Sequence, residues 1–493
     1  MSTIITGRNL IAGLWLESDA LFDSRSPSRP DEVIGTFPAS SLEEADAAVA
    51  AARRAYPAWR RTSRVLRAEL FDRLAQLVKR HTDDLACLMA RECGKVLAEC
   101  RAEVIEGLHM IQYVFGTGRH PSGEVLASEI AEKDAFVRRK PWGVAAVITP
   151  WNFPFAVPLW MLGPSLVEGN TVVFKPSEET PAVGQRIVEL MVEAGFPVGV
   201  VNLVHGDGNI GERLVRNSDV NVILFTGSWD VGSHIQQVSA TMVDRIVAAE
   251  MGSKSAVIVC KDARLDLAVN AAVISAFKTS GQRCVSAGRV LVHESLLDTF
   301  CEKLIAVTKR LVIGEPLDPA SFTGPVINQH AVDKVLSYNA LARQEGATVL
   351  LDGGRREGHY LTPFVYRIEA KSGIRCAREE VFGPHLAVIP FRTNEEAAAI
   401  YNDTPYGLSL GVITEDYRAM RFFREECEFG MGYVNLPCIG AEVHLPFGGV
   451  KRSGNGHPSA AGLVEAVTHK VSWTINHGED IRMAQGLTTG IEP

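Results

Sequence analysis

The chain has 493 residues, a length that favours two or three domains with large cores. Hydrophobic residues make up 46% and charged residues 22%, a balance typical of globular proteins and unlike that of disordered or fibrous ones. The formal net charge is −8, and no basic run is long enough to follow a nucleic-acid backbone. We therefore expect no nucleic-acid partner.

No apolar stretch is long enough to span a bilayer, and residues 1–8 lack a basic region followed by an apolar one. These two features predict a cytoplasmic protein without a membrane partner. The nine cysteines form no CxxC pair, which argues against a disulfide framework and a structural zinc site. We expect no metal and interpret most cysteines as buried thiols.

The first predicted helix begins near Ser41, because Ser41 and Glu44 have the spacing of a capping box and an alanine-rich run to Trp59 follows. A second helical region is expected from about Arg64 to Ala98.

From Val144 onward, short apolar runs alternate with helical stretches. Runs of this length without polar alternation are typical of strands buried on both faces, and alternation with helices predicts a doubly wound parallel sheet. Ligands bind beyond the carboxyl ends of such strands. The runs are Val144–Ile148, Thr171–Phe174, Val200–Val204, Val222–Phe225 and Ala256–Val259.

A second alternating series follows Lys261 and predicts a second α/β domain. Its helix-like segments lie near 265–280, 295–310 and 394–401, and its strand-like segments are Arg289–Val292, Leu386–Pro390 and Leu410–Ile413. The stretches 124–143 and 468–493 fit neither series, and we interpret them as a projecting hairpin and tail.

One cysteine stands in a distinctive setting. Thr279-Ser280-Gly281-Gln282-Arg283-Cys284 places Cys284 after a glycine-containing turn and beside an arginine. A nearby cation favours the thiolate, which is the reactive form of cysteine. Taken alone, Cys284 is more readily interpreted as one more core thiol.

This run and six others together resemble the aldehyde dehydrogenase superfamily, in the family's order and over nearly the whole chain. Three of them are Pro150-Trp151-Asn152-Phe153-Pro154, Lys175-Pro176-Ser177-Glu178 and Phe225-Thr226-Gly227-Ser228. The other three are Glu250-Met251-Gly252, Glu380-Val381-Phe382-Gly383-Pro384 and Pro446-Phe447-Gly448-Gly449.

The resemblance implies a covalent route to a carboxylic acid, with Cys284 as the nucleophile. It makes Asn152 and the backbone N–H of Cys284 the donors to the resulting alkoxide. It also makes Glu250 the general base that activates water. The family's coenzyme-A-acylating branch generally lacks this glutamate, so Glu250 predicts a free acid as product. By themselves, Asn152 fits a turn residue and Glu250 a surface glutamate.

The resemblance further implies a bound NAD. A glycine-containing strand-to-helix turn can receive a pyrophosphate, although the same turn fits a plain connection. Glu178 near the adenosine ribose favours NAD over NADP, whereas Lys175 and Ser177 leave NADP possible. Phe382 also fits simple core packing. The expected cofactor-binding residues are Ile148, Thr149, Pro150, Trp151, Lys175, Ser177, Glu178, Gly208, Gly211, Phe225, Gly227, Ser228, Gly252, Glu380 and Phe382.

Substrate choice rests on fewer residues. Gly440-Ala441 is similar to a loop of family members that act on amino-acid-derived semialdehydes, and the segment 453–460 is similar to the succinylglutamate semialdehyde branch. Val285, where members acting on glutamate semialdehyde usually have serine, weakens that one substrate, and Ser286 can supply a donor instead. We predict a semialdehyde with a remote carboxylate, held by Ser286, Gly440 and Ala441. An ordinary surface loop is the alternative.

The resemblance assigns an NAD-binding Rossmann-like domain to 1–123 and 144–250 and a catalytic domain to 251–467. It assigns oligomerisation, as a homodimer or homotetramer, to 124–143 and 468–493. Two other functions stay open: a broad-specificity dehydrogenase for aliphatic or aromatic aldehydes, and a non-catalytic scaffold of the same fold.

Overall fold

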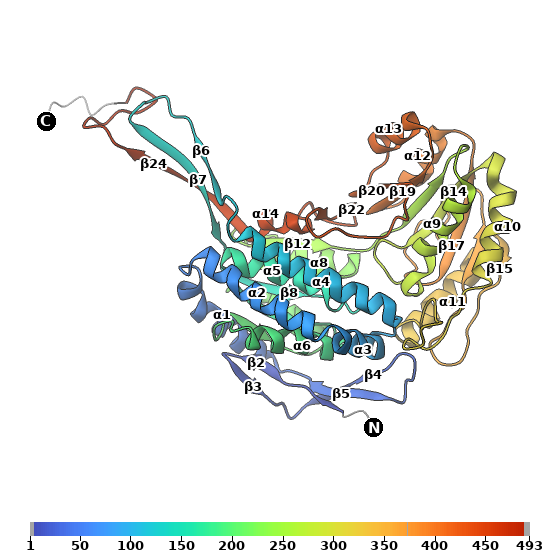
Figure 1. Ribbon diagram of the computed structural model, residues 1–493, viewed down its shortest axis with the longest axis horizontal. Coiled ribbons are helices and arrows are strands. Elements are labelled where there is room, and N and C mark those ends of the chain that lie inside the picture. Colours follow the sequence, from blue (N-terminus) through green and yellow to red (C-terminus); the bar gives the residue numbers. More distant parts are fainter. Residues whose placement is uncertain (1–3, 372, 488–493) are drawn as a thin grey trace.

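The computed structural model describes residues 4–371 and 373–487 (Figure 1). Predictions that concern residues 1–3 or the last six residues of the tail lie outside these ranges. Two seven-stranded sheets, each covered by helices on both faces, form the body, and a third sheet projects from it. The predicted fold class, a parallel-sheet domain with a second α/β domain, agrees with this architecture.

The first sheet has the order β12-β11-β8-β9-β10-β2-β3. Neighbours from β12 to β10 are parallel, whereas β2 and β3 add an antiparallel edge. Its strands are β2 Asn9–Ile11, β3 Leu14–Leu16, β8 Val144–Ile148, β9 Thr171–Lys175, β10 Val201–Leu203, β11 Val220–Thr226 and β12 Ile246–Glu250.

Alternate residues of β8 enter two different cores, as a doubly wound sheet requires. Ala145 and Val147 pack with α2–α6, whereas Val144 and Ala146 pack with α1, α7 and α8. The helices are α1 Leu42–Trp59, α2 Arg64–Arg80, α3 Thr82–Cys93, α4 Leu97–Thr117, α5 Ala156–Glu168, α6 Pro181–Glu193, α7 Gly208–Arg216 and α8 Trp229–Ser239.

The second sheet has the order β15-β16-β17-β14-β13-β19-β20 and is parallel except at β15. Its strands are β13 Ser255–Val259, β14 Ala287–His293, β15 Thr348–Leu351, β16 Phe364–Arg367, β17 His385–Phe391, β19 Ser409–Ile413 and β20 Met431–Val434. Its helices are α9 Leu265–Phe277, α10 Leu297–Thr308, α11 Gln329–Gln344, α12 Asn394–Asn402 and α13 Tyr417–Glu426.

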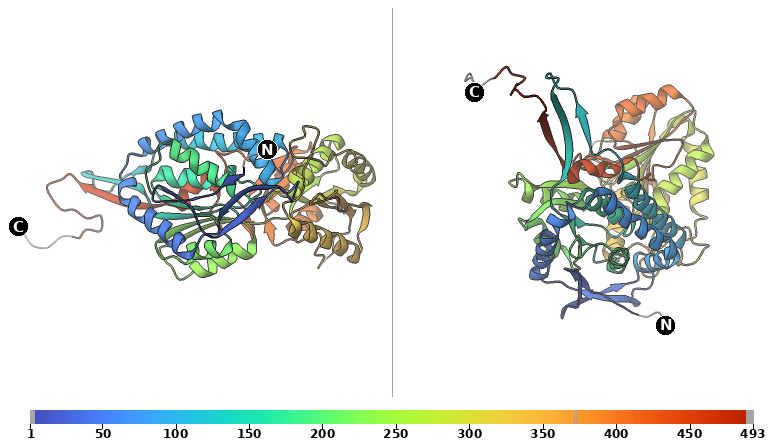
Figure 2. Two further views of the ribbon diagram at one scale, coloured as in Figure 1. Left: turned by 90° about the horizontal axis from the view of Figure 1, so that it is seen from below. Right: turned by 60° about the vertical axis from the view of Figure 1, so that its left-hand side comes forward.

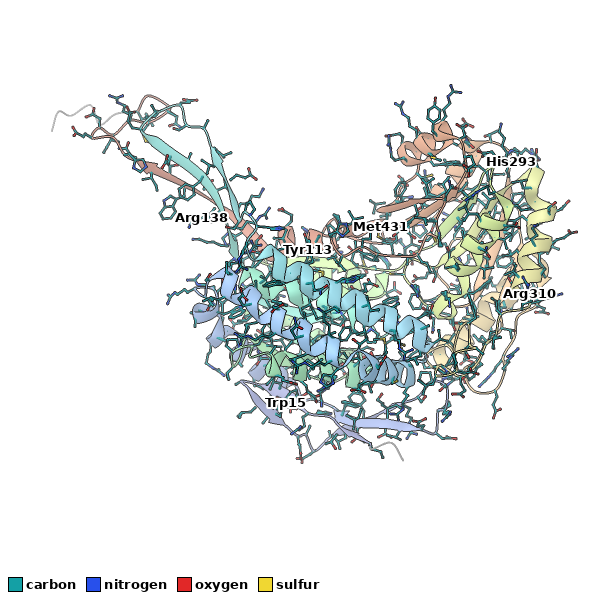
Figure 3. All side chains as sticks on the ribbon, in the orientation of Figure 1. Trp15, Tyr113, Arg138, His293, Arg310 and Met431 are labelled. Carbon is teal, nitrogen blue, oxygen red and sulfur yellow. The ribbon has the colours of Figure 1, made fainter. Side chains whose placement is uncertain are left out.

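A three-stranded sheet, β24-β7-β6, extends away from both domains, as the two views in Figure 2 show. It joins the two stretches that fit neither series, because β24 (Thr468–Asn476) pairs along the whole of β7 (Lys133–Pro141), whose other edge pairs with β6 (Gly123–Leu126). Figure 3 places Arg138 on this arm. Val125 and Trp473 expose large apolar side chains there.

Short elements complete the chain. The strands β1 Ile5–Thr6, β4 Leu21–Arg25 and β5 Val33–Pro38 form a small sheet near the N-terminus. The remainder are β18 Tyr406–Gly407, β21 Pro446–Phe447, β22 Val450–Lys451, β23 Ser459–Ala460 and α14 Val464–Val467, with 3-10 turns at Lys278–Gly281, Glu294–Leu296 and Ala461–Leu463. No helix in the described part of the chain is long and apolar enough to cross a membrane.

The capping box at Ser41 and Glu44 is confirmed, with both hydrogen bonds formed. The helical region expected from about Arg64 to Ala98 is confirmed, and it consists of α2, α3 and the start of α4. The chain breaks once at His81 and again at Gly94, whose left-handed φ of +75° ends α3.

The run Ala256–Val259 was grouped with the first sheet, yet it belongs to the second as β13. The position expected for this run in the first sheet is occupied by β12. The sequence did not predict β12 as a strand because alanine has a low preference for strands. The domain boundaries stay a prediction. The packing of α14 and β23 on α5 favours placing residues 459–467 with the first domain.

Candidate active site

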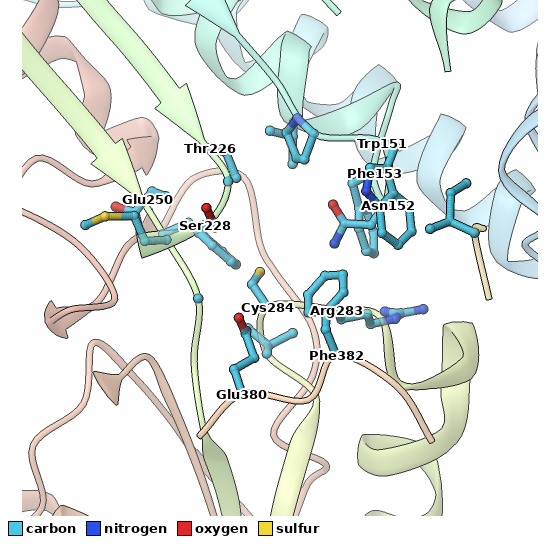
Figure 4. Close-up of a pocket in the computed structure, with 18 of the residues that line it drawn as sticks. Trp151, Asn152, Phe153, Thr226, Ser228, Glu250, Arg283, Cys284, Glu380 and Phe382 are labelled. Carbon is cyan, nitrogen blue, oxygen red and sulfur yellow. The ribbon is translucent and has the colours of Figure 1, made fainter. Parts of the chain in front are cut away.

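A cavity of about 360 Å³ lies where the two large sheets meet (Figure 4). The first sheet contributes the turns that follow β8, β11 and β12, all at carboxyl ends of parallel strands. The second sheet contributes the loops that precede β14 and β17. Loops from both domains therefore surround a single space, which lies at the strand ends where the first sheet is expected to bind a ligand.

The structure brings the three predicted catalytic residues together. Cys284 lies in the middle of the cavity in Figure 4, with Asn152 on one side and Glu250 on the other. The amide of Asn152 is buried, and its Nδ2 donates to the backbone oxygen of Gln282 at 2.9 Å. One of the two amide hydrogens of Asn152 therefore bonds to the Cys284 loop. This bond fixes the direction in which the second amide hydrogen points.

An unusual backbone presents Cys284. Thr279 and Ser280 have left-handed φ values of 54° and 53°, and Gly281 has a φ of +71°. Such conformations are costly for residues with a Cβ and persist only where the surroundings impose them. Here Thr323 accepts the N–H of Ser280 at 2.7 Å, so the turn is held from outside.

The expectation that Arg283 keeps Cys284 ionised is wrong. Arg283 pairs with Glu99, at 3.1 Å from Nη2 to Oε1, and its effect on Cys284 is the smallest of those acting there. Burial, followed by the charges of Glu380 and Glu250, raises the pKa of the Cys284 thiol to about 12. In the free protein the nucleophile is therefore a neutral thiol that must lose its proton as it reacts.

Glu250 is buried beside the glycines of the 448–454 segment, and its Oε2 has no hydrogen-bond partner among residues 4–371 and 373–487. Burial raises the pKa of its carboxyl well above the usual value, and a hydrogen bond from the Gly449 backbone opposes this only in part. A strongly perturbed carboxyl facing a cavity is typical of an acid–base residue.

A second cavity, of about 440 Å³, continues from the first, because Thr226 lines both. Ser228 caps α8 by accepting the Val231 N–H at 3.4 Å, so a helix N-terminus faces this region. Eight residues predicted to bind the cofactor line the second cavity: Ile148, Thr149, Lys175, Ser177, Glu178, Gly208, Gly211 and Phe225.

The other seven predicted cofactor residues line the first cavity: Pro150, Trp151, Gly227, Ser228, Gly252, Glu380 and Phe382. Glu380 is held by the Ser253 N–H at 2.7 Å, and a Cβ at Gly252 would lie 2.3 Å from its Oε2. Phe382 has a left-handed φ of 60° and packs edge-on against Trp151, with ring centroids 5.7 Å apart. The two cavities adjoin at Thr226, and all fifteen predicted cofactor residues lie along them.

Of the predicted substrate residues, Gly440 and Ala441 line the cavity. Ser286 does not: it lines a separate space of about 20 Å³, and its Oγ accepts the Arg283 N–H at 3.2 Å. Sequence reasoning missed Glu106 and Lys334, which also line the cavity. Both lie on helices without a motif of their own, so only their placement in space identifies them.

Residues 15–472 match the model of the aldehyde dehydrogenase family. The chain belongs to this family. It is 36% identical to alpha-ketoglutaric semialdehyde dehydrogenase of Bacillus subtilis (strain 168), over 90% of this chain and 93% of the relative. It is 34% identical to malonate-semialdehyde dehydrogenase 2 of Geobacillus thermodenitrificans (strain NG80-2), over 97% and 100%.

Solved structures have the same fold over nearly the whole chain. An NAD-dependent aldehyde dehydrogenase from Sinorhizobium meliloti has a TM-score of 0.93 at 32% identity, covering 98% of this chain and 97% of that one. PnpE in complex with nicotinamide adenine dinucleotide has a TM-score of 0.92 at 35% identity, covering 97% and 99%. An NADP-dependent enzyme of E. coli has a TM-score of 0.92 at 34% identity, covering 96% and 98%. The predicted family, fold class and enzyme class are confirmed.

We expect Gly281→Ala to reduce kcat more than tenfold, because a Cβ there would lie 2.3 Å from the backbone oxygen of Gly383 and displace the Cys284 loop. Gly346→Ala is the matched control, since Gly346 has a φ of +85° with no atom within 4 Å of the added carbon. Steady-state kinetics and thermal melting of both variants check this. Equal activity in the two variants would contradict it.

Proposed function

We propose that the protein uses NAD to oxidise a semialdehyde with a remote carboxylate to the corresponding dicarboxylic acid, through a thioester on Cys284. The observation that carries this proposal is the meeting of Cys284, Asn152 and Glu250 in one cavity that adjoins a second, with the predicted cofactor residues along both. A scaffold without catalysis has no need of this complete set.

In the first half of the reaction, the Cys284 sulfur forms a bond to the aldehyde carbon while the thiol proton leaves. That proton is released to solvent, so Glu250 stays free to act as the base in the second half of the reaction. The carbonyl oxygen becomes an alkoxide, for which Asn152 Nδ2 and the Cys284 N–H are the donors. Such donors count most where water is excluded, and the Asn152 side chain is buried.

NAD, when bound, supplies a hydride acceptor. The residues that would hold it are those lining the two adjoining cavities, with Glu178 and Lys175 in one and Glu380 in the other. After the hydride has left the substrate carbon, a thioester remains on Cys284. Glu250 then takes a proton from water as the water oxygen attacks, the C–S bond breaks, and the acid leaves.

The choice of NAD over NADP follows from charge. Glu178 Oε2 lies 3.5 Å from Lys175 Nζ, so the lysine already has an anionic partner and is less available to a 2′-phosphate. Relatives that bind NAD support this choice, and the E. coli neighbour shows that the same fold also accommodates NADP.

The remote carboxylate is inferred from the lining of the cavity. Arg283 lines the cavity with its guanidinium paired to Glu99, and Gly440 and Ala441 offer backbone next to open space. Two relatives named as semialdehyde dehydrogenases are consistent with such a substrate. A broad-specificity dehydrogenase is the alternative.

Cellular location and assembly are proposed on separate grounds. We place the enzyme in the cytoplasm, where its nine free cysteines stay reduced. We also propose a homodimer or homotetramer assembled through the β24-β7-β6 arm, whose exposed apolar residues include Val125 and Trp473.

The substrate proposal predicts higher kcat/KM for 3-oxopropanoate, 4-oxobutanoate or 5-oxopentanoate than for propanal, butanal or benzaldehyde. NADH formation at 340 nm with NAD and with NADP measures this, with Cys284→Ala as the control that loses activity. Higher kcat/KM for every uncharged aldehyde would overturn the semialdehyde assignment. Thiol-independent activity would overturn the mechanism.

The raised pKa of Glu250 predicts that kcat still increases with pH beyond the range in which an ordinary carboxyl is fully ionised, because only the deprotonated carboxylate accepts a proton from water. Glu250→Gln should keep a rapid burst of NADH, lose that pH dependence and turn over about 100-fold more slowly. Stopped-flow absorbance from pH 6 to pH 10 checks both phases. A variant that turns over at the wild-type rate would exclude Glu250 as the base.

Glu106 predicts a second pH effect, on substrate choice. Its Oε1 is shielded from solvent without a partner, and burial raises the pKa of its carboxyl to about 7. Below pH 7 the neutral carboxyl can donate to a substrate carboxylate, whereas above pH 7 the charged form repels it. The ratio of kcat/KM for 4-oxobutanoate to that for butanal should therefore fall as pH rises.

Taking this ratio cancels the titration of Glu250, because both substrates share the same chemistry. Glu106→Gln keeps the size of the side chain, removes its titration and should make the ratio independent of pH. A ratio that falls with pH equally in the variant would exclude Glu106 as its cause.

A further inference from the structure

The start of helix α4 contacts both halves of the active site. Lys95 lies just before α4, and Glu99 and Glu103 lie one turn apart on it, so the two carboxylates share a helix face. Lys95 is 3%, Glu99 8% and Glu103 1% exposed. The catalytic chemistry uses none of these three buried charges, so another role must account for them.

Glu103 and Lys95 hold the loop that contains Asn152. Glu103 Oε1 accepts the N–H groups of Phe155 at 2.8 Å and Ala156 at 3.1 Å, where α5 begins. Glu103 Oε2 pairs with Lys95 Nζ, which also donates to the backbone oxygen of Asn152 at 3.1 Å. The backbone of Asn152 is thus tied to α4, while its amide reaches across to Gln282.

Glu99 holds the loop that contains Cys284. Its Oε2 accepts both the N–H and the Oγ1 hydroxyl of Thr279, each at 3.2 Å, and its Oε1 pairs with Arg283. Thr279 is one of the two non-glycine residues with left-handed φ just before Cys284. Glu99 therefore imposes part of the backbone conformation that presents the nucleophile.

Phe153 joins the two contacts. Lys95 Nζ lies 3.9 Å from the centroid of its ring, and Arg283 Cζ lies 5.1 Å from it. One aromatic ring next to Asn152 is therefore approached by a cation from α4 and by a cation from the Cys284 loop.

We propose that the start of α4 sets the distance between the two oxyanion donors, and that Lys95, Glu99 and Glu103 are its positioning residues. A buried ion pair repays its desolvation only in part, so stability alone is a poor reason for Lys95 and Glu103 to be charged. Placing Asn152 accurately is a functional reason for Lys95 and Glu103 to be charged. This inference rests on the proposed function, because it requires Asn152 to stabilise the alkoxide.

The test is a double-mutant cycle between α4 and Asn152. Lys95→Met with Glu103→Gln removes both charges together, keeps an acceptor for the α5 N–H groups and deletes the contact with Asn152. The NADH burst rate, with saturating butanal and with saturating 4-oxobutanoate, should fall at least tenfold while KM changes less than twofold. In the Asn152→Ala background the same pair should change the burst rate less than twofold.

An equal loss in both backgrounds would overturn the proposal, as would an unchanged burst rate with Asn152 intact. Asn152→Ala at the wild-type rate would overturn the proposed oxyanion role and this inference together. A slow Asn152→Ala variant with additive losses would overturn the positioning role alone. The two failures are therefore distinguishable.

Two further variants serve as a stability control and as a substitute for the doubly substituted chain. Glu168→Gln breaks the ion pair with Arg64 at the opposite end of α5 and should lower the melting temperature without changing the burst rate. If the doubly substituted chain does not fold, Lys95→Gln replaces it in the same cycle and is judged by the same coupling with Asn152.

Discussion

The hydrogen bond from Asn152 Nδ2 to the backbone oxygen of Gln282 directly links the loop of the oxyanion donor to the loop of the nucleophile. The amide comes from the carboxyl end of β8 in the first sheet, and the carbonyl comes from the loop that leads into β14 in the second. A nucleophile and its oxyanion donor on different domains are useful only at a fixed separation. Three features of the structure act on that separation. They are the contacts from α4, the strained turn at 279–281, and the packing of Phe382 against Trp151.

Burial is the second constraint, and it determines the protonation of the site. It raises the pKa values of Cys284, Glu250 and Glu380, so the free site is depleted of negative charge. The same burial strengthens the donors that face the developing alkoxide.

Much of this site is predictable from the sequence because its residues lie in short motifs of neighbouring residues. Cys284, Asn152, Glu250 and the fifteen cofactor residues lie in the two connected cavities as expected. The parallel strands were predictable from β-branched runs, whereas β12 was not, because Ala248 and Ala249 have no strand preference.

What sequence could not give depends on distant contacts. Arg283 was expected to activate Cys284 because the two are adjacent in the chain. In the structure its guanidinium pairs instead with Glu99, which is 184 residues away in the sequence. Ser286 looked like a substrate donor, yet it turns back to its own loop. Glu106 had no motif and emerges only from the placement of α4 against the cavity.

The central claim is that oxidation proceeds through a thioester on Cys284 that Glu250 releases. Its most direct test is mass spectrometry of Glu250→Gln quenched in acid after one turnover with NAD and 4-oxobutanoate. We expect a single acyl adduct, located by peptide mapping on Cys284 and absent without NAD. Stoichiometric NADH without an adduct, or an adduct on another cysteine, would contradict the mechanism.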